Sequence, residues 1–552
     1  MSRGQRSAIG LLAIVSCVFA LLLYAEALWM GDLNQDEGWY LHASRLVHAG
    51  QVPYRDFFYS QTPLLPYVYG ALFPVWSPHG VAGGRALTAV FGLLAAFLAA
   101  WLTARLVPRH LSFAAGLTCF ALLAVNPYYA YFTTIVKTYG LAALLVTGGF
   151  LALSYSSRRV ALGSALLAGF LLACAAGTRI SLGAMLPVAG LYLLWHRRQA
   201  GHPWRWVAFG VGGLVGLAAI FGPSLIFAKE GFAFSVSYHV DRESRGLMDG
   251  FVNRAGFMSR FLRAYTVAAI VAFASLCWTF INRRQSRAAP VPGVDTCFAG
   301  LLLTAFLAVS LVHVASPFPY DDYQTPIAPL LAIFGSVLLW RNLSPQSTPE
   351  SGERGAHETA HPVGSQACVV LATVFVAVLV TAGTSELHQD WVILKRDRFW
   401  WIKKPAPPLQ VLRETARRIN ELYPQKGVML TQDAYLAVEA GWELPVEFAM
   451  GPFSYFPGLS TDEARRVKVV NDELLSELLG TSTAPVAAFS GYGLAIAAPH
   501  MRPLSDSERG HFLALVEDRF SKVMTVPHFG QAHTPLTVYA LKELTSGEGA
   551  RE

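Results

Sequence analysis

Long apolar segments separated by short loops dominate this chain and restrict its fold more than any other feature. Most of them reach the length, about 17–25 residues, that a helix needs to cross the hydrocarbon core of a membrane. Within lipid, the backbone of such a segment must satisfy its own hydrogen bonds, which favours helices. The chain of 552 residues is 53% hydrophobic and 14% charged, whereas a soluble protein averages about 25% charged residues. We therefore expect a mainly α-helical polytopic membrane protein.

The hydropathy pattern predicts about eleven transmembrane helices. The first is residues 8–30, which follow Arg3 and Arg6 and include a cleavage-like Ala25-Glu26-Ala27. A signal peptide is the alternative, but the run is long enough to span, so we expect an uncleaved anchor. The others are expected at residues 82–106, 111–125, 131–155, 160–177, 180–195, 206–228, 262–281, 297–315, 324–340 and 367–383. Residues 64–76 are short and broken by prolines, which favours a re-entrant or interfacial piece.

Arginines in alternate loops set the expected orientation of these helices. Basic residues in short loops stay on the cytoplasmic side of a membrane. With the spans counted as above, the following groups fall on one side: Arg3 and Arg6; Arg105 and Arg109; Arg158 and Arg159; Arg197, Arg198 and Arg205; Arg283, Arg284 and Arg287; Arg341 and Arg354. The N-terminus is therefore expected inside and the C-terminus outside, in an integral, multi-pass protein of a bacterial-type inner membrane.

The loops and the C-terminal region divide the chain into expected parts. The transmembrane domain covers residues 1–385. It includes a first outer loop at 31–81, a long outer loop at 229–261 and a flexible inner loop at 342–366. A surface-lying aromatic and basic segment with a proline linker follows at 386–408.

Residues 409–552 are soluble in character and predict a small α/β domain outside the membrane. We expect helices near 409–422, 461–479 and 505–520, the second beginning at a cap near Thr461. Strands are expected at 427–431, 485–490, 522–526 and 534–541. This region carries no nucleotide-binding fingerprint or glycine-rich phosphate loop.

The first outer loop contains the adjacent acids Asp36 and Glu37, a few residues beyond the first span. An amphipathic helix follows them and ends at Gly50, so the acids are expected at the boundary between water and lipid. A solvated pair of loop acids is the plain interpretation. The functional interpretation is a general base, with the second acid orienting it or helping to hold a divalent cation such as Mg or Mn. Tyr59 and Gln61 are expected in the wall of a substrate groove.

Basic residues near the outer face are candidates for neutralising a phosphate leaving group. A charge placed within a span is costly, so it suggests a function. The candidates are Arg85, Lys137, Arg179, Arg242, Arg245 and Arg254. The outer acids Asp321 and Asp322 would act as metal ligands only if they approached Asp36, and His313 is expected to be a hydrogen-bonded core histidine.

The remaining composition excludes other classes of function. All six cysteines lie in or beside apolar segments, so we expect neither a structural disulfide nor a thiolate metal site. The net charge of +7 comes mostly from loops between spans. It is therefore a signal of topology, and we expect no nucleic-acid partner.

Three stretches resemble a known superfamily. They are DEGWYLHASRLVHAG with QTPLLPYVYG and the following Gly84-Arg85-Ala86-Leu87, then NPYYAYFTTIVKTYGLAALL, then FPYDDYQTPIAPLLAI. Over about residues 1–385 the chain is similar to GT-C membrane glycosyltransferases, and within them to the bacterial protein O-mannosyltransferase (family 39) and aminoarabinose-transferase group.

The resemblance implies a polyprenyl-phosphate-sugar donor, a site at the outer face and an inverting single displacement. The acceptor would be a lipid, a glycan or a protein of the cell envelope. The family's first-loop catalytic acid falls on Asp36, beside Glu37. Gln61 departs from the family, which often has lysine there, so Arg85, Lys137 or the long outer loop would have to supply the missing charge.

The expected function is therefore transfer of a sugar, with Asp36 as general base. A transporter or lipid flippase is the first alternative, and it would show charges at mid-membrane and repeated halves. A non-enzymatic sensor or assembly protein that displays the C-terminal domain is the second. A lipid-linked glycan polymerase or ligase shares the enzyme class and differs in its acceptor.

Overall fold

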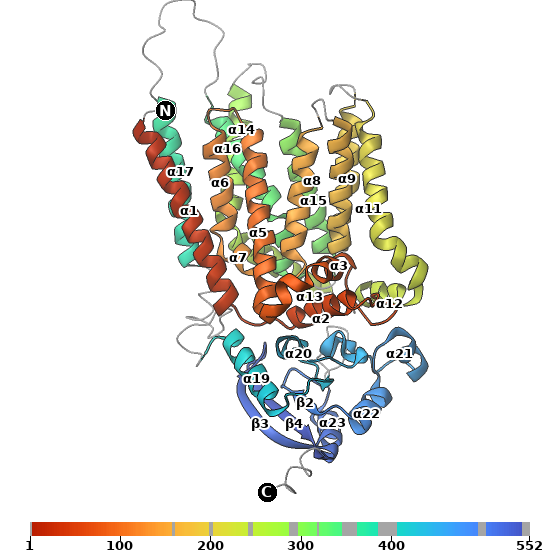
Figure 1. The fold of residues 1–552 in the computed structure, drawn as a ribbon. Coiled ribbons are helices and arrows are strands. Elements are labelled where there is room, and N and C mark those ends of the chain that lie inside the picture. The colour runs from red at the N-terminus through yellow and green to blue at the C-terminus, as the bar shows by residue number, and fades with distance from the viewer. Residues whose placement is uncertain are drawn as a thin grey trace, which may run out of the picture.

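The computed structural model describes residues 3–156, 161–197, 203–240, 247–285, 296–316, 319–344, 362–384, 406–494 and 504–543. Within them a bundle of long helices stands on a layer of short helices, and a small mixed domain lies beneath that layer (Figure 1). The described chain starts at the far end of the bundle, and its last strand lies in the small domain (Figure 1). The expected fold class, a helical membrane protein with a C-terminal α/β domain, is confirmed at this level.

The long helices of the bundle match the apolar segments. They are α1 (Arg3–Met30), α5 (Gly80–Arg105), α6 (Ser112–Ala124), α8 (Tyr139–Ser154), α9 (Ala161–Thr178), α10 (Met185–Trp195), α11 (Arg205–Phe227), α14 (Thr266–Gln285), α15 (Thr296–Ala315), α16 (Ala328–Asn342) and α17 (Pro362–Gly383). Among the described residues, 6 helices are long and apolar enough to cross a membrane, or 7 if the pair Gly250–Ala264 and Thr266–Ile281, which is bent by 89°, counts as one span. Four further apolar helices among these residues are shorter, so the expected count of about eleven spans stays a prediction.

One predicted span differs from the structure. Residues 131–155 were expected to form a continuous helix, but α7 (Pro127–Phe132) ends before residues 133–138, and α8 begins after them. Asn126 caps α7 by accepting from the Tyr129 N–H at 2.9 Å. Lys137 therefore lies in a non-helical break, where its side chain points from a loop and not from the middle of a span.

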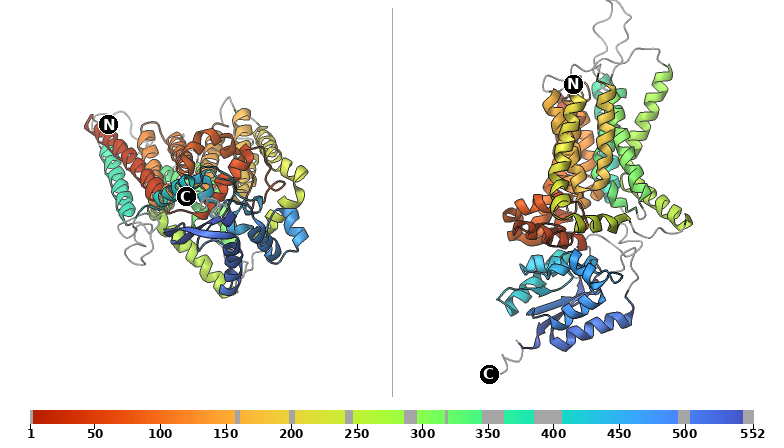
Figure 2. Two further views of the ribbon diagram at one scale, coloured as in Figure 1. Left: turned by 60° about the horizontal axis from the view of Figure 1, so that its bottom comes forward. Right: turned by 90° about the vertical axis from the view of Figure 1, so that its right-hand side faces the viewer.

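Short helices form the layer between the bundle and the C-terminal domain (Figure 2). They are α2 (Gln35–His48), α3 (Leu64–Ala71), α4 (Phe73–Trp76), α12 (Lys229–Val240) and α13 (Leu247–Ala264). The expected helix after the acid pair is α2, and the expected interfacial piece is α3 with α4. A capping box starts α2, with Asn34 and Glu37 bonding each other's backbone.

The C-terminal domain is a mixed sheet covered by helices. Its strands are β1 (Met429–Leu430), β2 (Val486–Phe489), β3 (Phe520–Phe529) and β4 (Thr534–Leu541), in the order β1-β2-β4-β3. β1 pairs parallel with β2, and the other pairs are antiparallel. The helices are α19 (Pro408–Leu422), α20 (Ala434–Ala440), α21 (Thr461–Val467), α22 (Asp472–Thr481) and α23 (Asp506–Arg519).

The helix expected at 461–479 is two helices. Ser460, not Thr461, caps α21, and Lys468 then takes a left-handed φ of 63°. Asn471 caps α22 by accepting from the Leu474 N–H at 2.9 Å. The helical spacing of apolar residues hid this break, because both helices bury their apolar faces in the same core.

α2 fixes the C-terminal domain to the membrane domain. Gln35 donates from Nε2 to the Gln432 carbonyl at 3.0 Å, and its N–H donates to Gln531 Oε1 at 2.6 Å. Beside it, a Cβ on Gly38 would lie 2.2 Å from the Tyr435 nitrogen, so the α2 and α20 backbones are in close contact. On the start of α5, Val81 N–H donates to Glu439 Oε2 at 2.8 Å.

The opposite end of the bundle carries basic side chains that join helix ends. Arg105 lies 3.4 Å from the centre of the Tyr155 ring, and Arg205 donates to the Ser156 carbonyl at 3.2 Å. The ends of α5 and α8 and the start of α11 therefore lie together, away from the C-terminal domain (Figure 1). The expected inner loop 342–366 and the segment 386–408 lie mostly outside the described residues.

Candidate active site

A cavity of about 760 Å³ lies where the helix bundle meets the C-terminal domain. Its wall comes from the start of α2, the break before α8, the residues after α9, the helix α12, the end of α15 and the short 3-10 helix Asp321–Ile327. Loops of the C-terminal domain close the other side. Segments far apart in the sequence thus meet around one hollow.

Asp36 faces this cavity from the first turn of α2. Its Oδ2 lies 3.2 Å from Lys137 Nζ, and its Oδ1 accepts from Trp39 Nε1 at 3.3 Å. The side chain keeps 27% of its surface exposed. The expected acid is therefore held in place and remains accessible from the cavity.

Lys137 lies between two carboxylates. Besides Asp36 it contacts Asp322 Oδ2 at 3.1 Å, and its own side chain is mostly buried. Asp322 thus lies near Asp36, which is the condition for the two acids to share a site. The group between them is the ammonium of Lys137.

Arg179 supplies the second cation of the cavity. It adopts an extended conformation between α9 and the 3-10 helix Ile180–Ala184. Its guanidinium lies 4.1 Å from the Tyr323 ring centre and 5.0 Å from that of Tyr139. The stacked rings fix the plane of the guanidinium, and its Nε atom has no hydrogen-bond partner among the described residues.

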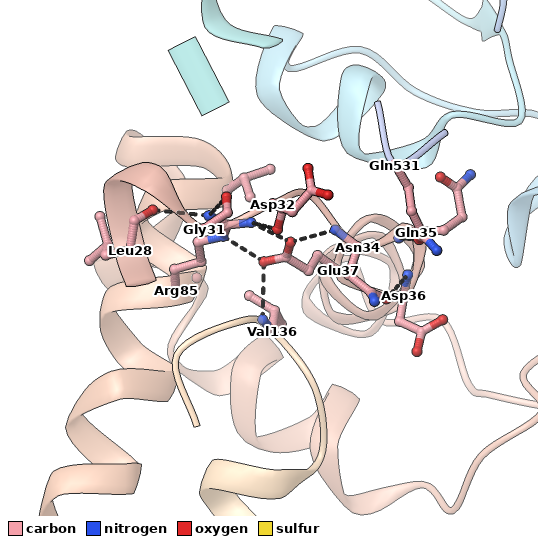
Figure 3. A network of polar contacts seen from close by, with 12 residues as sticks. Leu28, Gly31, Asp32, Asn34, Gln35, Asp36, Glu37, Arg85, Val136 and Gln531 are labelled. Atoms are coloured by element: carbon pink, nitrogen blue, oxygen red, sulfur yellow. Dashed lines mark hydrogen bonds and ion pairs between the residues drawn. The ribbon is translucent and has the colours of Figure 1, made fainter. Parts of the chain in front are cut away.

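Glu37 points away from the cavity, into a buried cluster (Figure 3). Arg85 Nε donates to Glu37 Oε1 and Arg85 Nη2 to Oε2, both at 2.7 Å. The N–H groups of Asn34 and Val136 donate to the same carboxylate at 3.0 and 3.1 Å. Both charged side chains are fully buried.

This geometry corrects two expectations of the sequence analysis. Arg85 also donates to the carbonyls of Leu28, Gly31 and Asp32, so its nitrogens are occupied by the protein and do not reach the cavity. Glu37 accepts four hydrogen bonds and has no exposed surface. The pair joins α1, α2, α5 and the break before α8, and so positions the loop that carries Asp36.

The other expected residues are distributed as follows. Gln61 lines the cavity. Tyr59 is fully buried behind it, edge-on to Trp39 and Tyr40. Arg254 donates to the Val314 carbonyl at 2.9 Å and does not line the cavity. Arg242 and Arg245 lie outside the described residues.

Solved structures with a similar fold were found for nearly the whole chain. ArnT from Cupriavidus metallidurans in the apo state has a TM-score of 0.58 at 16% identity, over 96% of this chain and 97% of that chain. The same protein bound to undecaprenyl phosphate also has a TM-score of 0.58, at 15% identity, over 95% of this chain and 97% of that one. The chain has the ArnT fold. No family model and no curated protein matches the sequence.

The likeness to ArnT is one of fold, and it agrees with the fold expected from the resemblance. It extends over the C-terminal domain as well, whereas the sequence motifs covered only the transmembrane part.

Several residues of the cavity were not among the site residues predicted from the sequence. Tyr139 and Tyr323 hold Arg179, and Tyr492 and Gln531 enter from the C-terminal domain. The tyrosines belong to motifs that resemble the ArnT-type group, so the motifs drew attention to the right segments. Nothing local distinguishes Tyr492 or Gln531, since their positions depend on how the two domains dock.

His313 lines the cavity and shares a hydrogen bond of 2.8 Å with the Ser181 hydroxyl, as expected of a hydrogen-bonded histidine. Within the described part of the chain, no group of three or more His, Cys, Asp or Glu side chains is arranged to hold a metal ion. The divalent cation that the acid pair suggested thus has no ligand set there, because Glu37 turns away and Lys137 lies between Asp36 and Asp322.

Proposed function

We propose that this chain is a membrane glycosyltransferase that moves a sugar from a polyprenyl-phosphate donor to an acceptor at the outer face of the membrane. The observation that carries the proposal is the meeting of Asp36, Lys137 and Arg179 in one cavity at the end of the helix bundle. A carboxylate beside two cations suits a reaction in which a hydroxyl loses a proton and a phosphate leaves. The ArnT fold supports the proposal, since ArnT has been solved with undecaprenyl phosphate bound.

Asp36 is the proposed general base. It takes the proton of the acceptor hydroxyl as the acceptor oxygen attacks C1 of the donor sugar. The bond between C1 and the phosphate oxygen breaks, and polyprenyl phosphate leaves with the electron pair. A single displacement of this kind inverts the configuration at C1.

Lys137 and Arg179 are the proposed phosphate partners. Arg179 has no carboxylate within ion-pair distance in the described residues, and its plane is fixed by Tyr139 and Tyr323. It therefore suits the phosphate of the incoming donor. When Asp36 accepts the proton its charge disappears, and Lys137 then has Asp322 alone as an anionic partner. The ammonium is thereby freed to stabilise the departing phosphate.

The test is transfer in vitro from a panel of radiolabelled polyprenyl-phosphate sugars, with the full chain in lipid nanodiscs, with and without chelator. Asp36→Asn should lower the rate at least about 100-fold, as expected for loss of a general base. Asp462→Asn is the matched control, because Asp462 is exposed on α21.

A fully active Asp36→Asn protein would contradict the assignment of the base. A wild-type protein that moves polyprenyl phosphate across the bilayer without transferring sugar would support the flippase alternative.

A further inference from the structure

The cavity is chemically divided into two halves. Among the described residues that line it, every Asp, Glu, Lys and Arg belongs to the membrane domain: Asp36, Lys137, Arg179 and Asp322. The residues that the C-terminal domain adds are uncharged: Met450, Phe453, Tyr492 and Gln531. Charge is therefore concentrated on one side of Asp36 and is lacking on the other.

The charges of the first half balance before any substrate binds. Two carboxylates face two cations, and Lys137 is already shared by Asp36 and Asp322. A phosphodiester donor adds one negative charge, which Arg179 and Lys137 can accommodate. A second anion in the same cavity would find no further lysine or arginine among the described lining residues, and an unpaired buried charge is costly.

The second half has the composition of a saccharide-binding surface. Tyr492 and Phe453 present aromatic rings, against which the C–H face of a sugar packs. Gln531 and Gln61 add amide groups, which pair with hydroxyls. The Gln531 oxygen already accepts from the Gln35 N–H, so Gln531 offers its NH2 group as a donor. Tyr492 lines the same cavity as Asp36 and Lys137, so a sugar on its ring would lie in the space that the base faces.

We propose that Tyr492, Phe453 and Gln531 of the C-terminal domain form an acceptor subsite for an uncharged saccharide, so that the transferred sugar is added to a neutral glycan and not to a phosphorylated or acidic one. This inference rests on the proposed function and names its acceptor class. The C-terminal domain thereby determines specificity, while the membrane domain supplies the reacting groups.

The first experiment determines the charge of the glycan that the enzyme forms in native membranes. Native membranes containing wild-type chain or Asp36→Asn are incubated with labelled donor, the glycans are released by mild acid, and the products are separated by anion exchange. Label that depends on Asp36 should appear in the unretained, neutral fraction.

Label only in the retained fraction would overturn the acceptor assignment and leave the proposed function intact. If no product depended on Asp36, the proposed function itself would fail.

The second experiment separates acceptor binding from donor binding. The acceptor is the neutral glycan that the first experiment finds labelled. With it, Tyr492→Ala should raise the acceptor KM about tenfold, which is the size expected for losing an aromatic contact. The donor KM should stay within about twofold of wild type. Tyr492→Phe keeps the ring and should stay within about threefold of wild type. Tyr423→Ala, in the same domain but outside the cavity lining, is the control.

A rise in the donor KM alone would contradict the subsite. Phe453→Leu provides a second variant should Tyr492→Ala unfold, which thermal unfolding would report, and it is expected to raise the acceptor KM in the same way.

Discussion

At the residue scale, two adjacent carboxylates have different roles because a helix separates their directions. Successive side chains on an α-helix point about 100° apart. Glu37 therefore turns towards Arg85 in the protein interior, while Asp36 faces the cavity and Lys137. The pair looked like one acidic motif in the sequence, but one member holds the structure together and the other is the proposed base.

Glu37→Gln should destabilise the protein strongly. It leaves the guanidinium of Arg85 fully buried without its counter-charge, and breaking a buried pair in this way costs about 3–5 kcal/mol. Thermal unfolding in detergent measures the loss. Glu443→Gln removes a mostly exposed carboxylate that lies 3.8 Å from Arg45, and it should cost less than about 1 kcal/mol. Equal effects of the two variants would contradict the role of Glu37.

Asp433 should make stability depend on pH. Burial raises the pKa of this carboxyl to about 6, although the N–H and hydroxyl of Ser490 and the hydroxyl of Tyr435 donate to it. The folded protein thus holds the proton more tightly than the unfolded chain. Asp433 therefore contributes to the free energy of unfolding below pH about 4. This contribution, about 3 kcal/mol in total, is lost as the pH rises through the pKa of the folded protein.

Asp433→Asn removes this titration. Thermal unfolding between pH 4 and pH 7 should show the variant gaining stability relative to wild type as the pH rises, whatever its absolute stability. A difference from wild type that stays constant over this pH range would contradict a buried, proton-holding carboxyl.

At the scale of elements, helices and strands could be predicted from the sequence wherever a local pattern of residues determines the structure. Apolar runs located the long helices, because lipid requires continuous helical hydrogen bonding, and the strand expected at 534–541 is β4. Features that depend on contacts between distant segments could not be predicted from the sequence. The break at Lys137 and the contact of Lys137 with Asp322 depend on packing between segments far apart in the chain. Arg85 was misread because its partners come from a helix end and a loop.

The contact between α2 and α20 is an element-scale feature that a single methyl group should disturb. Gly38→Ala would place a Cβ 2.2 Å from the Tyr435 nitrogen, so the helices must separate, at a cost of about 1–3 kcal/mol. Gly210→Ala, in α11, meets nothing within 4 Å. It should be neutral or stabilising, since alanine favours a helix over glycine by about 1 kcal/mol.

Thermal unfolding and the transfer rate test the two glycine variants. Because Asp36 and Tyr492 approach the cavity from the two sides of this contact, Gly38→Ala should also slow transfer. Unchanged stability and rate in Gly38→Ala would show that the contact is looser than the structure indicates.

At the scale of the whole molecule, the chain places its reacting groups at one end of the bundle and its basic loops at the other. The end of α5, which is Arg105 and is followed by Arg109, and the start of α11, which is Arg205, are at the end of the bundle away from the C-terminal domain (Figure 1). Positive residues in short loops remain in the cytoplasm, so we propose that the cavity and the C-terminal domain lie outside. This orientation is required by the proposed function, since the acceptor subsite opens between the membrane surface and that domain.

Cysteine labelling tests this orientation. The native cysteines Cys17, Cys119, Cys174, Cys277, Cys297 and Cys368 are free, so they can be replaced by serine or alanine to give a silent background. In that background, Gln425→Cys, exposed on the C-terminal domain, should react with a membrane-impermeant maleimide in intact spheroplasts. Arg109→Cys, exposed at the opposite end, should react only after lysis. The reverse pattern would place the cavity in the cytoplasm, where the arginines would line the wrong side, and would contradict transfer at the outer face.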